Sequence, residues 1–151
     1  MANSLSQIFV HITFHVKNGA DIKNEERQKL HAYIAGVINN MGSTALAVGG
    51  TRNHVHILAT LPKTMALSDM VRTIKTESSK WIKQVDRFIY GHFAWQDGYG
   101  AFSVSSSVIN KTKEYIANQE EHHKKMTWQE EYKLFLDEYG VKYDERYLFS
   151  D

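Results

Sequence analysis

The stretch that decides the fold is TRNHVHILATL, residues 51–61. Its alternation and its β-branched residues predict a strand. Because side chains two apart on a strand point to the same face, we expect Arg52, His54 and His56 on one face. Two imidazoles on one rigid face suit a metal ion, and a guanidinium beside them suits an anion such as phosphate. Two buried, hydrogen-bonded histidines without a metal would explain the pattern as well.

The composition is that of one soluble globular domain. The chain has 151 residues, of which 42% are hydrophobic and 23% charged. It has no apolar run long enough to span a bilayer and no N-terminal signal peptide, which predicts a cytoplasmic protein without a membrane partner. Cysteine is absent, which excludes disulfides and thiolate metal sites. The net charge of +1 does not indicate a nucleic-acid binder, although a local basic patch would suffice.

The periodicity predicts an α+β chain. In order, the expected elements are strand 6–17, helix 24–41, strand 44–48, strand 51–61, a helix from about 68 to 85, and strand 93–105. We expect Gly49-Gly50 to turn the second strand into the third, Ser68 to cap the second helix, and Asp97-Gly98 to interrupt the last strand. The order β-α-β-β-α-β predicts a ferredoxin-like (split βαβ) antiparallel four-stranded sheet with helices on one face. The histidine pair would then lie mid-sheet, on the face opposite the helices and open to a ligand.

Two further helices are expected after this core. The first runs from 106 to about 126 and has only a thin apolar stripe. Tyr115 and Gln119 lie four residues apart on it and therefore share a face. An exposed helix with one packed tyrosine would give the same pattern. Thr127 and Glu130 form a capping-box signal for the second helix, and the aromatic tail 141–151 is expected to dock. We interpret 1–151 as one domain, with a core (1–105) and C-terminal helices and tail (106–151).

Four motifs in this order resemble a known family. They are the His-hydrophobic-His strand, the segment WQDGYGAFS at 95–103, the Tyr115-Ile116-x-x-Gln119 helix and the run EHHKK at 121–125. Together they resemble the single-tyrosine transposases of the insertion-sequence 200/605 group, in the HUH nuclease superfamily. The resemblance extends from the first strand to the segment 143–148.

The resemblance implies a metal-assisted DNA transposase. His54, His56 and Gln119 would bind Mg²⁺ or Mn²⁺, and Zn²⁺ is disfavoured without Cys or a third His. Tyr115 would attack a DNA phosphodiester to give a 5′-phosphotyrosine and a free 3′-OH. The general base is left open among Lys111, His122 and a metal-bound water.

The resemblance also implies the partners. The substrate would be single-stranded DNA with a hairpin near each transposon end, and the protein a homodimer. The tyrosine helix would complete the metal site of its own or of the other subunit, and the sequence leaves both arrangements open. Phosphate contacts and base stacking are expected from Arg52, Lys75, Lys111, Trp95 and Tyr99, although core packing would also explain the aromatic residues.

Three other readings compete with an active transposase. A catalytically silent DNA-hairpin-binding protein on the same scaffold is the main alternative, and the occupied catalytic positions argue against it. An RNA-binding module with stacked aromatics would need aromatic residues where His11, Thr13, His54 and His56 stand. A histidine-triad hydrolase is disfavoured because Leu58 takes the next position on that face.

Overall fold

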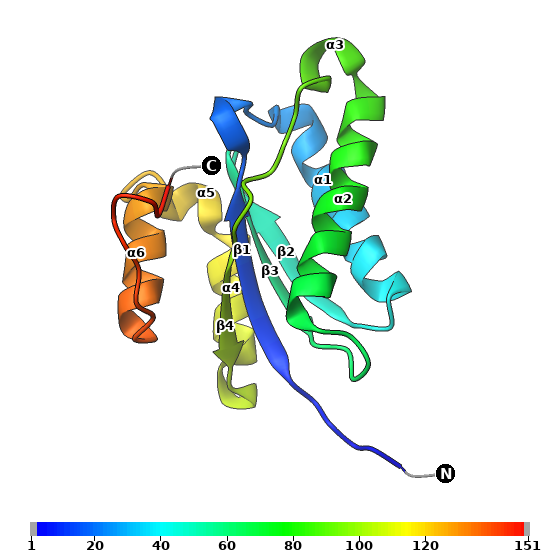
Figure 1. Ribbon diagram of the computed structural model, residues 1–151, viewed down its shortest axis with the longest axis vertical. Coiled ribbons are helices and arrows are strands. Elements are labelled where there is room, and N and C mark those ends of the chain that lie inside the picture. Colours follow the sequence, from blue (N-terminus) through cyan, green and yellow to red (C-terminus); the bar gives the residue numbers. More distant parts are fainter. Residues whose placement is uncertain (1–2, 150–151) are drawn as a thin grey trace.

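The computed structural model describes residues 3–149 and contains one four-stranded antiparallel sheet (Figure 1). Its strands are β1 (Phe9–His15), β2 (Ala45–Gly50), β3 (His54–Thr60) and β4 (Gly100–Val104). They lie in the order β2-β3-β1-β4, so the first and third strands are central. The expected ferredoxin-like topology is confirmed. An isolated bridge from Val16 to Trp95 extends the pairing of β1. The pairing is then interrupted at Asp97-Gly98, as predicted, before β4 begins at Gly100.

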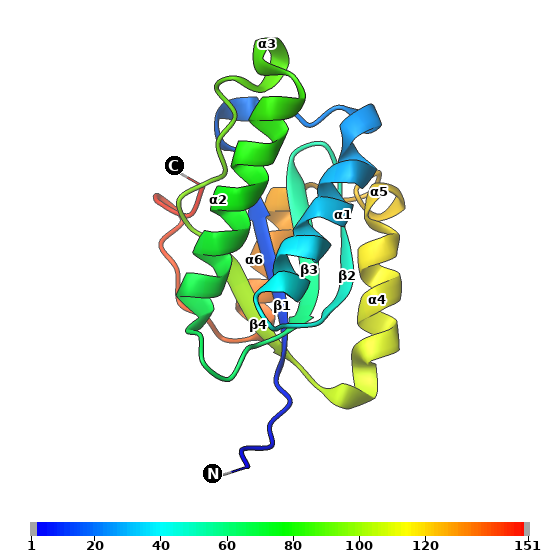
Figure 2. The same ribbon diagram turned by 90° about the vertical axis from the view of Figure 1, so that its right-hand side faces the viewer.

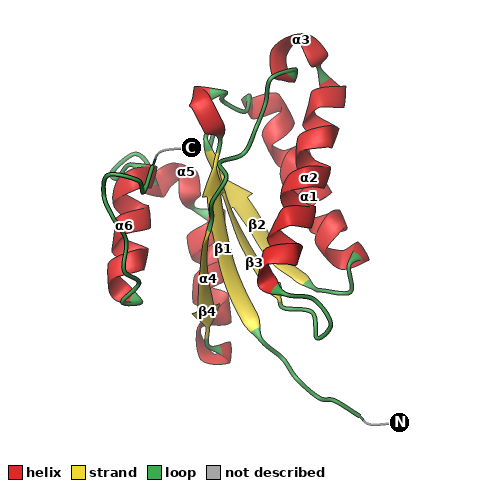
Figure 3. Cartoon of the chain, in the orientation of Figure 1, coloured by secondary structure: helices red, strands yellow, loops and turns green. Residues whose placement is uncertain are grey.

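Helices cover both faces of this sheet (Figures 2 and 3). The two long helices, α1 (Asn24–Asn40) and α2 (Leu67–Val85), lie on one side. The C-terminal helices α4 (Ile109–Ala117), α5 (Gln119–His122) and α6 (Trp128–Glu138) lie on the other. The sequence analysis expected the face of the histidine pair to be open to a ligand. That expectation is wrong, because the chain's own C-terminal part covers this face. The apolar side chains of α6 supply the reason, because they pack against Phe102 of β4.

The main core lies between the sheet and the two long helices. Alternate residues of the central strands, such as Ile12 and Ile57, are fully buried there. They meet residues at helical spacing, including Ile34 of α1 and Ile74 of α2. This is the burial that the alternating and helical patterns predict.

The turn between β2 and β3 is later than expected. Gly49 and Gly50 both belong to β2, and the chain turns at 51–53. A Cβ on Gly49 would lie 2.5 Å from the carbonyl oxygen of Ile116 in α4. The glycine thus allows a helix to approach the strand closely, a contact that no local turn signal reveals. Consequently Arg52 stands in the turn and not on the strand.

Some helix boundaries also differ from the expected ones. α2 begins at Leu67, its N-cap is Ala66 and no side chain caps it, so Ser68 lies inside the helix. A short helix, α3 (Arg87–Tyr90), was not predicted, although Asp86 caps it by accepting two backbone N–H bonds. The expected helix 106–126 is three pieces: a 3₁₀ turn (Ser106–Val108), α4 and α5. A second 3₁₀ turn covers Lys17–Gly19.

The C-terminal end folds largely as its signals indicate. The capping box of Thr127 and Glu130 is present with both hydrogen bonds. The tail packs back on α6 through Tyr143, Leu148 and Phe149, as expected. Tyr147 instead has 65% of its surface exposed. The last two residues of the tail lie outside the described residues.

Candidate metal and tyrosine site

The two predicted histidines form the centre of a buried polar cluster. His54 and His56 are fully buried in β3, and their Nε2 atoms face the same carboxylate oxygen, Oε1 of Glu131. The Nε2–Oε1 distances are 3.8 Å for His54 and 2.8 Å for His56. The imidazoles therefore converge on one point, as the spacing on the strand predicts.

The other ring nitrogens are held from behind. Nδ1 of His54 lies 2.9 Å from Oδ1 of Asn53 and 3.0 Å from Oγ1 of Thr51. Nδ1 of His56 lies 2.7 Å from Nε2 of His11. Such partners fix the ring orientation and leave Nε2 as the ligating atom. Burial, and then the neighbouring His56, lowers the pKa of His54 to about 2 and of His11 to about 3. The neutral imidazole, which is the form that binds metal, is thus favoured.

The C-terminal helices bring the remaining polar groups. Oε1 of Gln119, on α5, lies 3.0 Å from Nε2 of both His54 and His123. Nε2 of His123 lies 3.3 Å from Oε1 of Glu131 on α6. Ligand atoms of His54, His56, His123 and Glu131 all lie within 4.8 Å of one another, so this group could hold a metal ion.

His123 and Glu131 were not singled out by the sequence analysis. Glu131 is 2% exposed and lies among Trp128, Tyr132 and Leu136, which form the buried side of α6. A carboxylate three residues after Trp128 on an apolar stripe is unusual and was the available signal. For His123 the signal was weaker, because an adjacent pair of histidines on a polar segment also fits a solvated surface.

Tyr115 joins this cluster in the same chain. Its hydroxyl donates a short hydrogen bond to Oε2 of Glu131 and lies 3.4 Å from Nε2 of His122. Its ring centroid is 5.8 Å from that of His56. Burial and then the hydrogen bond to Glu131 raise the pKa of Tyr115 above its ordinary value. Burial alone would raise the pKa of Glu131, but hydrogen bonds led by those from His123 and His56 outweigh it and lower that pKa.

Tyr115 is also reachable from outside. It is half-buried and lines a pocket together with Lys111, His122 and Lys125. The phenol is therefore not sealed in the interior. Glu114 and Glu121 line the same pocket, so a negatively charged ligand would meet both lysine and carboxylate side chains beside the tyrosine.

Three of the other residues expected to contact DNA, Lys75, Trp95 and Tyr99, line one pocket, which does not include Tyr115. Trp95 is 6% exposed on the α1–α2 side of the sheet, and its Nε1–H donates to Ser78 at 2.9 Å. The prediction that DNA bases stack on Trp95 is therefore wrong, because the core encloses the ring of Trp95. Lys75 donates to the carbonyl oxygens of Gln96 (2.7 Å) and Gly98 (2.6 Å), so it stabilises that loop. The ammonium of Lys75 also lies 5.9 Å from the ring of the half-buried Tyr99.

The turn position of Arg52 places it beside the cluster and not within it. Its guanidinium pairs with Asp21 at 3.1 Å. It borders a pocket that His123 and Trp128 also line. Lys111 is thus the predicted DNA contact that shares a pocket with Tyr115.

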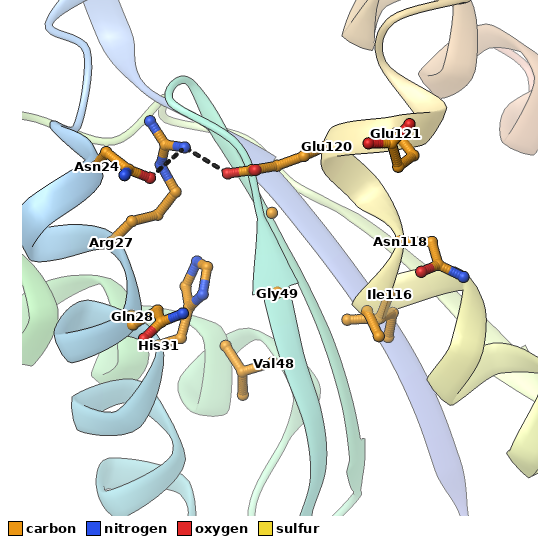
Figure 4. Close-up of a pocket in the computed structure, with 12 residues that line it drawn as sticks. Asn24, Arg27, Gln28, His31, Val48, Gly49, Ile116, Asn118, Glu120 and Glu121 are labelled. Atoms are coloured by element: carbon orange, nitrogen blue, oxygen red, sulfur yellow. Dashed lines mark hydrogen bonds and ion pairs between the residues drawn. The ribbon is translucent and has the colours of Figure 1, made fainter.

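A separate pocket lies between α1, β2 and α4 (Figure 4). Arg27 of α1 reaches across its upper end to Glu120 of α5, with an N–O distance of 2.5 Å. Below this ion pair, Ile116 faces the strand beside Gly49. These contacts attach the segment that carries Tyr115 and Gln119 to the core. The pocket contains none of the four clustered ligand residues.

Comparison with known proteins identifies the family of this chain. The family model described as "Transposase IS200 like" matches residues 4–119. The chain belongs to the IS200-like transposase family. The match includes His54, His56, Tyr115 and Gln119 and ends before His123 and Glu131. No curated protein gives a significant match.

Two solved structures share the fold of this family member. One is a Deinococcus radiodurans R1 protein assigned as a transposase, with TM-score 0.62, 18% identity, and coverage of 79% of this chain and 95% of that one. The other is a REP-associated tyrosine transposase bound to a REP hairpin, with TM-score 0.58, 17% identity, and coverage of 82% and 74%. Within residues 3–149, no helix combines the length and apolar character needed to cross a bilayer.

Proposed function

We propose that this IS200-like transposase cleaves and rejoins single-stranded DNA at transposon ends through Tyr115. The observation that carries the proposal is the convergence, in one chain, of the Tyr115 hydroxyl and the His54–His56 pair on the same carboxylate. A structural tyrosine would not need two oriented imidazoles beside it. Two imidazoles that only bind a metal ion would not need a phenol within the same hydrogen-bond network.

The chemistry follows from the groups present. Oη of Tyr115 forms a bond to the scissile phosphorus, the bond from phosphorus to O3′ breaks, and the products are a 5′-phosphotyrosine and a 3′-OH. The covalent bond conserves the energy of the cleaved ester, so a 3′-OH can later reverse the step without ATP. His54, His56 and Gln119 would hold Mg²⁺ or Mn²⁺, which supplies charge stabilisation at the phosphate when bound.

The proposed substrate is a single strand with a hairpin. The structurally similar REP-associated transposase was bound to a REP hairpin, which supports this substrate class. Lys111 and Lys125 border the Tyr115 pocket and would contact phosphates, and Arg52 would do so on the side of His123. Tyr99 stays a proposed contact, whereas Trp95 and Lys75 are not included. A homodimer is proposed through the edge strands of the sheet.

The test is covalent adduct formation. Labelled single-stranded oligonucleotides from the DNA flanking the gene, each containing a hairpin, are mixed with the protein and Mn²⁺ or Mg²⁺. A band of the protein–DNA adduct that resists denaturation is expected for the wild type and absent for Tyr115→Phe. Hairpin binding should be retained by this variant, since only one hydroxyl is removed. Chelation with EDTA should abolish the adduct, and Mn²⁺ should restore it.

Tyr147→Phe is the matched control, because that tyrosine is exposed in the tail. It should form the adduct as the wild type does. If the wild type binds the hairpin but forms no adduct with either metal, the protein is the catalytically silent hairpin binder. An adduct that persists in Tyr115→Phe would assign the nucleophile to another residue.

A further inference from the structure

Glu131 lies between the imidazoles and the tyrosine, and its two oxygens face different partners. Oε1 faces Nε2 of His56 (2.8 Å), His123 (3.3 Å) and His54 (3.8 Å). Oε2 accepts the hydrogen bond from Tyr115 and lies 3.1 Å from Nε2 of His122. Glu131 is 2% exposed. It connects the imidazoles of β3 with the tyrosine of α4.

We infer that Glu131 joins the metal site to the nucleophile, with Oε1 as a metal ligand beside His54, His56 and His123 and with Oε2 as the acceptor of the Tyr115 proton. This inference rests on the proposed function and goes beyond it by assigning a ligand and a base from α6. Neither His123 nor Glu131 lies within the residues that the family model matches.

The ligand half is supported by spacing. Ligand atoms about 2.1 Å from a common ion lie roughly 3–4 Å from one another, and the separations around Oε1 fall in or near this range. The backing of His54 by Asn53 and of His56 by His11 leaves both Nε2 atoms directed at Oε1. Three imidazoles and a carboxylate, together with the amide oxygen of Gln119, favour Mn²⁺ over Mg²⁺. His123 is the third histidine that a zinc site requires.

The base half follows from the hydrogen bond. As the bond from Oη to phosphorus forms, the phenol proton passes to Oε2 of Glu131. The departing O3′ takes up one proton, either directly from protonated Glu131 or from solvent to which Glu131 releases its proton, so no net proton is gained or lost. Of the bases considered earlier, Lys111 has no hydrogen bond to the Tyr115 hydroxyl among those described. His122 lies 3.4 Å from that hydroxyl, which is a longer contact than the hydrogen bond to Oε2 of Glu131.

The experiment measures metal binding and chemistry separately. Mn²⁺ and Mg²⁺ binding to the protein without DNA is measured by calorimetry, and adduct formation by the oligonucleotide assay at saturating Mn²⁺. Glu131→Gln should weaken Mn²⁺ binding about 10-fold or more. It should also slow adduct formation about 100-fold or more, because an amide cannot accept the proton. His123→Gln removes an imidazole on the Oε1 side only, so it should weaken Mn²⁺ binding about 10-fold or more.

Glu138→Gln is the matched control, because it changes an exposed carboxylate of the same helix. If Glu131→Gln does not fold, Glu131→Asp is used, which keeps the charge and shortens the reach by one methylene. Unchanged Mn²⁺ affinity and adduct rate in the Glu131 variant, with Tyr115→Phe inactive, would overturn the inference and leave the proposed function standing. If the wild type forms no adduct but Glu131→Gln binds Mn²⁺ more weakly than the wild type, the proposed function and the base role are refuted. The ligand role is then supported.

Discussion

Replacing Gly49 by alanine should slow the reaction of Tyr115, although the substitution changes no residue of the cluster. Gly49 is also the β-sheet partner of His56. The new Cβ would lie 2.5 Å from the carbonyl oxygen of Ile116 and 2.9 Å from its Cγ2. Backbone atoms cannot rotate away, so α4 must move. Restoring an ordinary separation of 3.4 Å requires a shift of 0.9 Å. Tyr115 directly precedes Ile116 in the same helix and would move with it.

The size of the effect follows from this shift. A misplacement of about 1 Å in a reacting group can cost roughly 100-fold in rate. Overpacking a well-packed contact costs about 1–3 kcal/mol of stability. We therefore expect Gly49→Ala to form the covalent DNA adduct about 100-fold more slowly at saturating Mn²⁺ while unfolding at lower urea concentration. Both quantities are measured on the same preparation.

Gly36→Ala is the matched control. Gly36 lies on an exposed face of α1 and an added Cβ would meet no atom within 4 Å. Alanine is the better helix former by about 1 kcal/mol, so this variant should be more stable and as active as the wild type. If Gly49→Ala matches the wild type in stability and adduct rate, the close contact between β2 and α4 does not position Tyr115, and the reasoning is refuted.

Three further predictions concern stability. Ser78→Ala removes the acceptor of the buried Trp95 N–H and should lower the free energy of unfolding, measured in urea, by about 1–3 kcal/mol. DNA affinity should not change, and weaker DNA binding would indicate that Trp95 contacts DNA. Thr127→Ala removes the N-cap of α6 and should cost about 1 kcal/mol; an unchanged urea midpoint would show that packing alone holds this helix. Burial, and then the nearby Arg27 charge, lowers the pKa of His31 to about 4 from 6.5. The unfolded chain therefore binds a proton between these values that the folded protein does not, and stability falls as the pH falls from 7 to 5. His31→Gln should remove on the order of 1 kcal/mol of this fall, a figure reduced for the partial exposure of the ring, and equal pH dependence in both proteins would contradict the assignment.

The sequence predicted the elements whose signal is local and periodic. Alternation along β1 and β3, and helical spacing in α1 and α2, are consequences of burial on one face, so the order of elements and the central position of His54 and His56 could be inferred. The capping box of Thr127 was also local. The Gly49-Gly50 pair misled because glycine serves both turns and close backbone approach, and only the packing of Ile116 distinguishes the two uses.

The sequence by itself determined the strand that orients two imidazoles and the helical region that carries Tyr115 and Gln119, which the structure divides between α4 and α5. Only the tertiary structure decided that the C-terminal helices cover the histidine face, that Trp95 belongs to the core, and that Glu131 lies between the tyrosine and the imidazoles. The reason is physical. Periodicity records which side of an element avoids water. The partners in this polar cluster include side chains as far apart as His54 and Glu131, 77 residues along the chain, and they are fixed only when separate elements pack.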